Sequence, residues 1–404
     1  MIVVSRGRPD PLRLCLTAIG QLCHPGFEIV VVADATGRRA VAAMGWETKI
    51  KLVGFDVANI SAARNAGLAE AAGEIVAFID DDAVPEPSWL DHLTRPFADA
   101  GIAATGGYVI GRNGISFQWK ARAVNRLGEA AALQTADDDP FEPSPPPGYV
   151  AKTEGTNCAF RRDVLARLGG FDPGFRYYLD ETDVNLRLAA AGGRSVIVPG
   201  ALVHHGYARS ARRAADRAPR DLTEIGASTA LFLRKHAPEA EHRAALSHLS
   251  AAQRRALIGH MVAGGLEPRD IARLLAGLEA GVRAGMKRPL AGLEAIPSPT
   301  TPFRSFHRDL RGAGATQIAG RPWQRRRLRA EAAKAVARGE IVTVFRFSPT
   351  ALPHHVRFHP GGWWEQVGGL FGPARRDEPV FRVAGFRARV DKERARVSLA
   401  RQCR

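Results

Sequence analysis

The stretch Gly73-Glu74-Ile75-Val76-Ala77-Phe78-Ile79-Asp80-Asp81-Asp82 is the most informative part of this chain for its fold. A short apolar run rich in Ile, Val and Phe ends in three carboxylates, and Pro85 and Pro87 prevent the strand from continuing. The pattern predicts a buried β-strand. Open α/β sheets bind ligands beyond the carboxyl ends of their strands, so the aspartates are predicted at a ligand site. Clustered carboxylates favour Mg²⁺ or Mn²⁺, whereas the same run without support from its neighbours is typical of a solvated acidic loop.

The flanking segments predict an α/β fold. Further strands are expected at residues 2–4, 27–32 and 49–55, and helices at residues 10–19 and from residue 61 onward. Strand, helix and strand in this order imply right-handed crossovers and a mainly parallel sheet, as in Rossmann-like nucleotide-binding domains. The chain has no P-loop motif, and no G-x-G-x-x-G follows the first strand. We therefore expect a metal ion and side chains, rather than a glycine loop, to hold phosphates.

The charge of the chain is divided unevenly along its 404 residues. Residues 1–205 hold 20 Lys and Arg against 24 Asp and Glu, and residues 206–404 hold 37 against 17, which gives net charges of −4 and +20. The basic half is expected to meet an anionic partner, such as a membrane surface or a phosphorylated acceptor. Because no nucleic-acid-binding motif is recognisable, nucleic acid is not expected as a partner.

Cysteine usage and hydropathy predict a cytoplasmic protein, with peripheral association with the inner face of the membrane as a further expectation. No apolar run approaches the roughly 20 residues of a transmembrane helix. No basic segment or cleavage site suggests a signal peptide. The four cysteines show no C-x-x-C spacing, so we expect reduced thiols and neither a zinc nor a redox motif.

Several motifs in a fixed order give residues 1–235 a resemblance to a known family. They lie at residues 28–34, 63–67, 80–82, 155–157, 160–162, 170–172, 182–187 and 198–199, with His205 at the end. In these motifs the chain resembles the family-2 glycosyltransferases of the GT-A fold, inverting enzymes that use a nucleoside-diphosphate sugar. The resemblance implies an α/β nucleotide-sugar-binding domain over this region.

The resemblance also implies roles for individual residues on the donor side. Asp34 corresponds to an acid that contacts the nucleotide base, and Arg64 to a basic position near the phosphates. Asp80 and Asp82 correspond to the D-x-D pair that faces ribose and metal, and His205 to a histidine that completes the metal site. The implied donor-binding set is Ser5, Arg6, Asp34, Arg64, Asp80 and Asp81, and the implied ligands of Mn²⁺ or Mg²⁺ are Asp80, Asp82 and His205.

On the acceptor side, Asp183 corresponds to the acid that removes the proton from the acceptor hydroxyl. The chain departs from the family at Thr182, where many relatives have glutamate. Glu181 is therefore a rival for the base, with Asp183 preferred. The adjacent histidines His204 and His205 leave the register of the metal ligand open.

The second half of the chain is predicted as a helical extension over residues 236–290 and a small basic α+β region of unknown role over residues 291–404. Within that region we expect a linker at residues 291–322 and strands at residues 341–347, 356–358 and 381–390, interrupted by Gly361-Gly362-Trp363-Trp364. A basic helix at residues 323–338 suits anionic lipid headgroups, with a solvated face as the alternative. Its arginine cluster comprises Arg321, Arg325, Arg326, Arg327 and Arg329.

The expected function is transfer of a sugar from a UDP- or dTDP-type donor to a hydroxyl of a glycan or glycolipid, in surface polysaccharide synthesis. A divalent cation would stabilise the diphosphate as it leaves, and a carboxylate would take the proton of the attacking hydroxyl. The alternative is a catalytically inactive GT-A domain that serves as a binding or scaffold protein.

Overall fold

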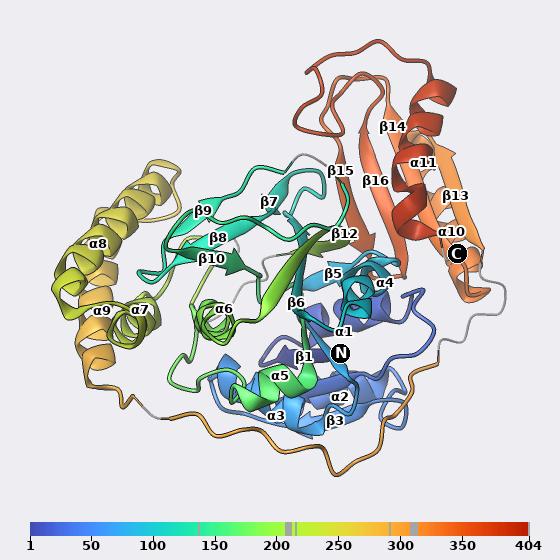
Figure 1. Ribbon diagram of the computed structural model, residues 1–404. Helices are drawn as coiled ribbons and strands as arrows, with labels where there is room; N and C mark the ends of the chain where they lie inside the picture. Colours follow the sequence, from blue (N-terminus) through green and yellow to red (C-terminus); the bar gives the residue numbers. More distant parts are fainter. Residues whose placement is uncertain (136–137, 207–211, 215, 291, 308–313, 403–404) are drawn as a thin grey trace.

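The structure is a computed structural model that describes residues 1–404 except 136–137, 207–211, 215, 291, 308–313 and 403–404. Figure 1 shows a central α/β domain with a group of helices on one side and a second, smaller sheet on the other. The first sheet carries the candidate site. The expected α/β class is confirmed.

The main sheet has nine strands in the order β3-β2-β1-β4-β11-β6-β12-β5, with β7 paired to β6. The first four are parallel, whereas β11 runs antiparallel to both β4 and β6. The carboxyl ends of β1 and β4 therefore meet at one edge, as the sequence pattern predicts. The bounds are β1 (Ile2–Ser5), β2 (Val30–Ala33), β3 (Lys51–Gly54), β4 (Ile75–Asp80), β5 (Ala83–Pro85), β6 (Ile102–Ile110), β7 (Phe117–Trp119), β11 (Cys158–Arg161) and β12 (Arg194–His205).

Helices cover both faces of this sheet because both faces are apolar. Successive side chains of a strand point to opposite faces, so Ala77 and Ile79 of β4 enter one core, whereas Val76 and Phe78 enter the other. The first core is closed by α1 (Pro9–Ile19), α2 (Ala35–Ala43) and α4 (Trp89–Thr94), with the short helix η1 (Arg95–Ala98) after it. The second is closed by α3 (Ile60–Glu70), α5 (Arg162–Arg167) and α6 (Asp180–Ala190).

A small antiparallel sheet and three helices flank the domain. The sheet has the order β10-β8-β9, with β8 (Arg122–Asn125), β9 (Ala130–Ala132) and β10 (Tyr149–Lys152). The helices are α7 (Thr223–His236), α8 (Glu239–Val262) and α9 (Pro268–Lys287). Gly281 and Gly285 allow α9 to approach α7 closely, since a Cβ at Gly281 would lie 1.9 Å from the carbonyl oxygen of Thr223.

The chain then returns along the outside of the α/β domain, a path visible in Figure 1. Ile296 N donates to Ala166 O at 3.0 Å, and Phe306 pairs with Phe27 in an isolated β-bridge. Residues 291–322 were predicted as a linker. In the described part of this range, the chain instead packs on the domain and then forms a strand.

The second sheet has the order β13-β14-β16-β15. Its strands are β13 (Ala315–Gly320), β14 (Ile341–Ser348), β15 (His355–His359) and β16 (Trp363–Gly369). After a short helical turn, η2 (Pro322–Gln324), α10 (Arg325–Ala337) packs on one face, and α11 (Phe386–Arg401) packs on the other.

Two predictions for this region are wrong. Residues 386–390 were expected in a strand, but they begin α11. The apolar residues, with arginines between them, recur at a spacing that places them on one face of a helix. Trp363 and Trp364 were expected to lie in a break between strands, and they begin β16 instead. The break falls on the preceding turn, where Gly362 has a φ of +87°.

A buried ion pair joins this second sheet to the α/β domain. Arg401 of α11 donates to both carboxylate oxygens of Glu86 at 2.8 Å, and both side chains are at most 4% exposed. His204 lies 2.8 Å from the same carboxylate, and its ring lies against Trp364 of β16. The two sheets are therefore connected by specific charged contacts rather than by the chain alone.

Each described helix is too short or too polar to cross a membrane. Cys15 and Cys158 are free and buried. Cys23 is bonded in a disulfide, so the prediction of four reduced thiols is wrong for this residue. The absence of a local motif gave no information on cysteines that are distant in sequence.

Candidate functional site

A cleft of about 680 Å³ opens at the carboxyl ends of β1 and β4. It is bounded by the loop after β1, the ends of β4 and β12, and the first residues of α6. Among the residues that the structure describes, seven arginines and five carboxylates line it, so the cleft suits an anionic ligand once a cation joins the carboxylates. These residues are Arg6, Arg8, Arg64, Arg176, Arg212, Arg213, Arg220, Asp80, Asp82, Glu154, Asp180 and Glu181.

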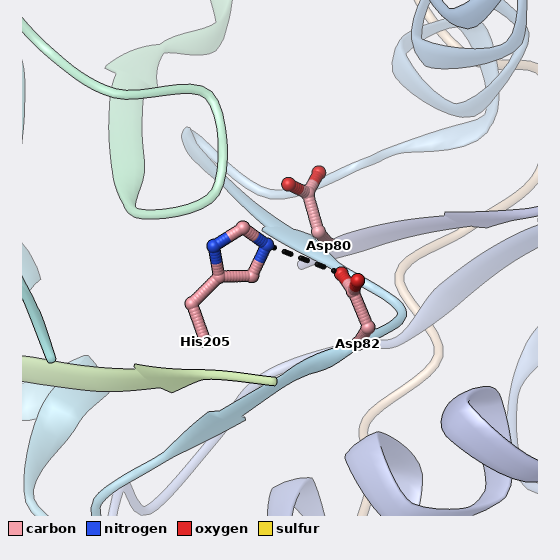
Figure 2. A group of neighbouring side chains, drawn as sticks. All are labelled: Asp80, Asp82 and His205. Carbon is pink, nitrogen blue, oxygen red and sulfur yellow. Dashed lines mark ion pairs between the residues drawn. The ribbon is translucent and has the colours of Figure 1, made fainter. Parts of the chain in front are cut away.

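Asp80, Asp82 and His205 come together on one wall of the cleft. Figure 2 shows the imidazole facing the Asp82 carboxylate, with the Asp80 carboxylate beside them, and the ligand atoms of the three residues all lie within 4.8 Å of one another. Nε2 of His205 lies 3.3 Å from Oδ1 of Asp82. Asp80 ends β4, Asp82 lies in the turn after it, and His205 ends β12, so only the folded sheet brings the three together.

The donor atoms of this group fit a divalent cation. Nδ1 of His205 lies 3.1 Å from the side-chain oxygen of Gln118 and can donate to it; in that neutral tautomer, Nε2 directs a lone pair at Asp82. A lone pair and a carboxylate repel each other unless a proton or a metal cation lies between them. Two carboxylates and one imidazole suit Mn²⁺, and the carboxylates also suit Mg²⁺.

The register of the two histidines follows from strand alternation. His204 points to the opposite side of β12 from His205, where it contacts Glu86. Of the two, only His205 therefore lies beside the aspartates.

Asp81 does not line the cleft, although it was predicted to bind the donor. Its side chain is fully buried and pairs with Arg8, which also contacts Oδ2 of Asp82 at 3.1 Å. Burial raises the pKa of Asp81 to about 7, against the opposing effect of the Arg8 charge. Asp81 lies in the turn between β4 and β5, where its side chain points into the protein, whereas Asp80 and Asp82 reach the cleft.

Arg64 connects the metal-ligand candidates to α6. Its guanidinium donates to Asp180 at 2.5 Å, to Asp80 at 3.2 Å and to the carbonyl oxygen of Gly155 at 3.0 Å. Gly155 is required at this contact, because a Cβ there would lie 2.8 Å from the nearest guanidinium nitrogen. Although Arg64 is almost completely buried, its edge reaches the cleft.

The first residues of α6 supply the carboxylates of the opposite wall. Tyr178 and Leu179 have φ values of +73° and +66°, a left-handed conformation that is costly for residues other than glycine. This sharp turn ends at Asp180 and Glu181, which both line the cleft. Backbone strain is thus located directly before the two acids.

The two acids differ in their electrostatic surroundings. Burial acts to raise the pKa of Glu181, but the ion pair with Lys152 at 2.9 Å outweighs it and lowers this pKa to about 2. Burial raises the pKa of Asp180 to about 7, opposed by Arg64 and reinforced by the negative charge of Glu181. The side chain of Glu181 is 19% exposed, against 4% for Asp180, so Glu181 is the more accessible acid.

Asp183 lies outside the cleft. Its side chain is fully buried and contacts Arg187 at 2.7 Å, and Lys235 and His236 at 2.8 Å. Residues two positions apart on a helix point about 200° apart, so Glu181 faces β10 and the cleft, whereas Asp183 faces α7. The preference for Asp183 over Glu181 came from the family resemblance, and the complete burial of Asp183 does not support it.

Of the remaining residues predicted to bind the donor, two line the cleft and one does not. Ser5 and Arg6 line the cleft, and Arg6 pairs with Asp56 at 2.9 Å. Asp34 instead caps α2: its carboxylate accepts from Gly37 N at 2.8 Å and from Gly7 N at 3.0 Å. Asp34 therefore shapes the loop after β1, and it is not among the residues that line the cleft.

Sequence reasoning missed several residues of the cleft. Arg8 lies in the loop after β1, and that position was a usable signal. The ion pair of Lys152 with Glu181 could not be predicted, because the two residues are distant in sequence. The density of arginine after His205 could have indicated the group Arg212, Arg213 and Arg220.

Comparison with known proteins agrees with the motif order. Residues 1–169 match the family described as "Glycosyl transferase family 2". The O-antigen biosynthesis protein RfbC of Myxococcus xanthus is 29% identical over 238 residues, which cover 54% of this chain and 18% of that protein. A glucosyl-dolichyl phosphate glucuronosyltransferase of Haloferax volcanii is 34% identical over 115 residues, 28% of this chain and 34% of that protein.

A pre-mycofactocin glycosyltransferase of Mycobacterium tuberculosis is 28% identical over 151 residues, 36% of this chain and 30% of that protein. The chain thus spans at most about a third of the length of these three relatives.

Two solved structures, GalNAc-T7 with UDP, GalNAc and Mn²⁺ and S. aureus TarS, are each 17% identical, with TM-scores of 0.38 and 0.39. They cover 51% and 63% of this chain, and 41% and 42% of their own chains. Likenesses this weak add nothing to the family match. The match to glycosyl transferase family 2 thus covers residues 1–169 of the 404 residues, the N-terminal part of this chain.

Proposed function

We propose that this protein is an inverting glycosyltransferase that moves a sugar from a nucleoside-diphosphate sugar, of the UDP or dTDP type, to a hydroxyl of a glycan or glycolipid. The observation that carries the proposal is the convergence of Asp80, Asp82 and His205 on one wall of an arginine-lined cleft. The family match over residues 1–169 supports the same reaction class.

On the donor side, Asp80, Asp82 and His205 would hold Mn²⁺ or Mg²⁺. This cation supplies charge stabilisation to the diphosphate leaving group. Arg64 donates to Asp80 and fixes the direction of its carboxylate. Arg8 does the same for Asp82, so both ligands are pre-oriented by guanidinium groups.

On the acceptor side, we assign the general base to Glu181, the rival that the sequence left open. The acceptor oxygen attacks the anomeric carbon as the bond to the diphosphate breaks, and the hydroxyl proton passes to the Glu181 carboxylate. The low pKa of Glu181 keeps this carboxylate ionised at neutral pH. A single displacement of this kind inverts the anomeric centre.

The names of the relatives support a surface glycan or a lipid-linked acceptor. One relative is named for O-antigen biosynthesis, and another for a dolichyl phosphate sugar. A cytoplasmic enzyme at the inner face of the membrane would meet both the nucleotide sugar and such an acceptor. The +20 charge of residues 206–404 suits that surface.

A panel of UDP- and dTDP-sugars tests the proposal. The purified protein with Mn²⁺ is expected to release the nucleoside diphosphate from at least one of them, slowly with water and faster with an acceptor extract. EDTA and Asp82→Asn are each expected to abolish the release. Binding of a nucleotide sugar without turnover under every condition would favour an inactive scaffold instead.

A further inference from the structure

A second group of arginines gathers in the C-terminal sheet, far from the cleft in sequence. We call Arg325, Arg329, Arg346 and Arg357 the C-terminal arginine cluster. Three of them converge on one carboxylate, Glu365, whose side chain is only 1% exposed. Arg329 lies 3.1 Å from it, Arg357 lies 2.5 Å from it, and Arg346 lies 3.7 Å from it.

The fold places this cluster at a favourable position for an anion. Strands β13 and β14 are parallel and are connected through α10, and Gly320 at the end of β13 pairs with Arg346. Val342, Val344 and Arg346 alternate along β14, and the two valines pack against Leu328 of α10. Arg346 therefore lies under the start of α10, at the carboxyl edge of two parallel strands.

The helix dipole adds to these positive charges. η2 runs directly into α10, and the backbone N–H of Arg325 donates to the carbonyl oxygen of Pro322, so the first N–H group of α10 is already bonded. The positive end of the helix macrodipole still lies at the start of α10, beside the cluster.

The charges of the cluster are not balanced. Three arginines contact a single carboxylate, and Arg325 adds a further positive charge that acts on Arg346. Nε of Arg346 is buried without a hydrogen-bond partner in the described part of the chain. Burial lowers the pKa of the Arg346 guanidinium, Glu365 opposes this, and the positive charges of Arg325, Arg329 and Arg357 lower it further. A bound anion would relieve this repulsion.

We propose that the C-terminal arginine cluster, together with the N-terminus of α10, is a binding site for a phosphate group. Guanidinium groups bind phosphate oxygens in pairs, which suits four arginines on adjacent elements. The phosphate can belong to a free diphosphate or to an anionic lipid headgroup. Trp323, 74% exposed two residues before α10, would lie at the headgroup level in the second case.

The test measures binding to the full chain in EDTA, with pyrophosphate by calorimetry and with phosphatidylglycerol or phosphatidylcholine vesicles by sedimentation. Arg346→Gln and Arg357→Gln are each expected to weaken binding about tenfold, the loss of one charged hydrogen bond. Glu365→Gln is expected to strengthen it, because it removes the competing carboxylate. Arg326→Gln makes the same charge change at an exposed position of α10 and serves as the control.

The pattern across variants decides the outcome. Pyrophosphate binding that Arg346→Gln weakens and Asp82→Asn leaves unchanged supports a site for a free diphosphate, separate from the cleft. Binding to phosphatidylglycerol vesicles alone, with the same dependence on Arg346, supports a lipid phosphate. Equal losses in Arg326→Gln and Arg346→Gln, or no binding to either probe by folded parent protein, would overturn the proposal.

Discussion

Replacing Glu181 with Gln is expected to slow sugar transfer while leaving donor binding intact. The amide keeps the size of the side chain but cannot accept the proton, and general-base catalysis contributes about 10²- to 10⁴-fold. Lys152 keeps Glu154 as a second partner at 3.2 Å, so the wall of the cleft should persist. We therefore expect kcat to fall by about 10²-fold or more, with the Kd of the nucleotide sugar within about twofold of the parent.

The matched variant Asp183→Asn should behave in the opposite way. Asp183 is fully buried among Arg187, Lys235 and His236, and removing one partner of a buried ion pair costs about 3–5 kcal/mol. Arg187 keeps two backbone carbonyl partners and Lys235 keeps Asp172, so the lower figure of about 3 kcal/mol applies. The folded fraction should transfer sugar at nearly the parent rate.

The assay combines two measurements on each variant: urea unfolding for the free energy of unfolding, and nucleoside diphosphate release at saturating donor for kcat. The reasoning is refuted if folded Asp183→Asn loses transfer while Glu181→Gln keeps it. In that case, α6 would have to present Asp183 to the acceptor in a different conformation.

Two further predictions concern stability. Arg401→Gln should lower the free energy of unfolding by about 3 kcal/mol, because it leaves the buried Glu86 without its bidentate partner. The control Arg194→Gln removes an exposed pair with Glu142 and should cost about 1 kcal/mol or less. Equal losses in urea unfolding would contradict this prediction. Asp180 has a folded-state pKa of about 7 against an ordinary value of 3.8, so between pH 4 and 7 the folded state keeps a proton that the unfolded state releases. The contribution of Asp180 therefore lowers the free energy of unfolding as the pH rises, and Asp180→Asn should remove that contribution; an unchanged pH dependence in the variant would contradict the assignment.

The sequence predicted the sheet around β4 because that strand carries a complete local signal: an apolar run, three carboxylates and then prolines. The position of His205 beside Asp80 and Asp82 also followed, but only through the family resemblance, since β12 is distant in sequence. The choice between His204 and His205 needed the direction of each side chain, which strand alternation determines once the register is known.

The errors have a common physical origin. Which acid of α6 faces the cleft depends on what packs against the helix, and Lys152 and His236 come from distant segments. The same holds for Asp34, where a capping role and a ligand-binding role have the same sequence pattern. In the C-terminal region, the spacing of Arg and apolar residues in 386–401 fits a helix, and a short apolar run alone misled the assignment.

Calorimetric titration of the parent protein with UDP and with dTDP, in Mn²⁺ and again in EDTA, tests the central claim most directly. If Asp80, Asp82 and His205 hold a cation for the diphosphate, one nucleotide should bind at least tenfold more tightly with Mn²⁺, and Asp82→Asn should abolish the difference. Equal affinity in Mn²⁺ and EDTA would contradict the account.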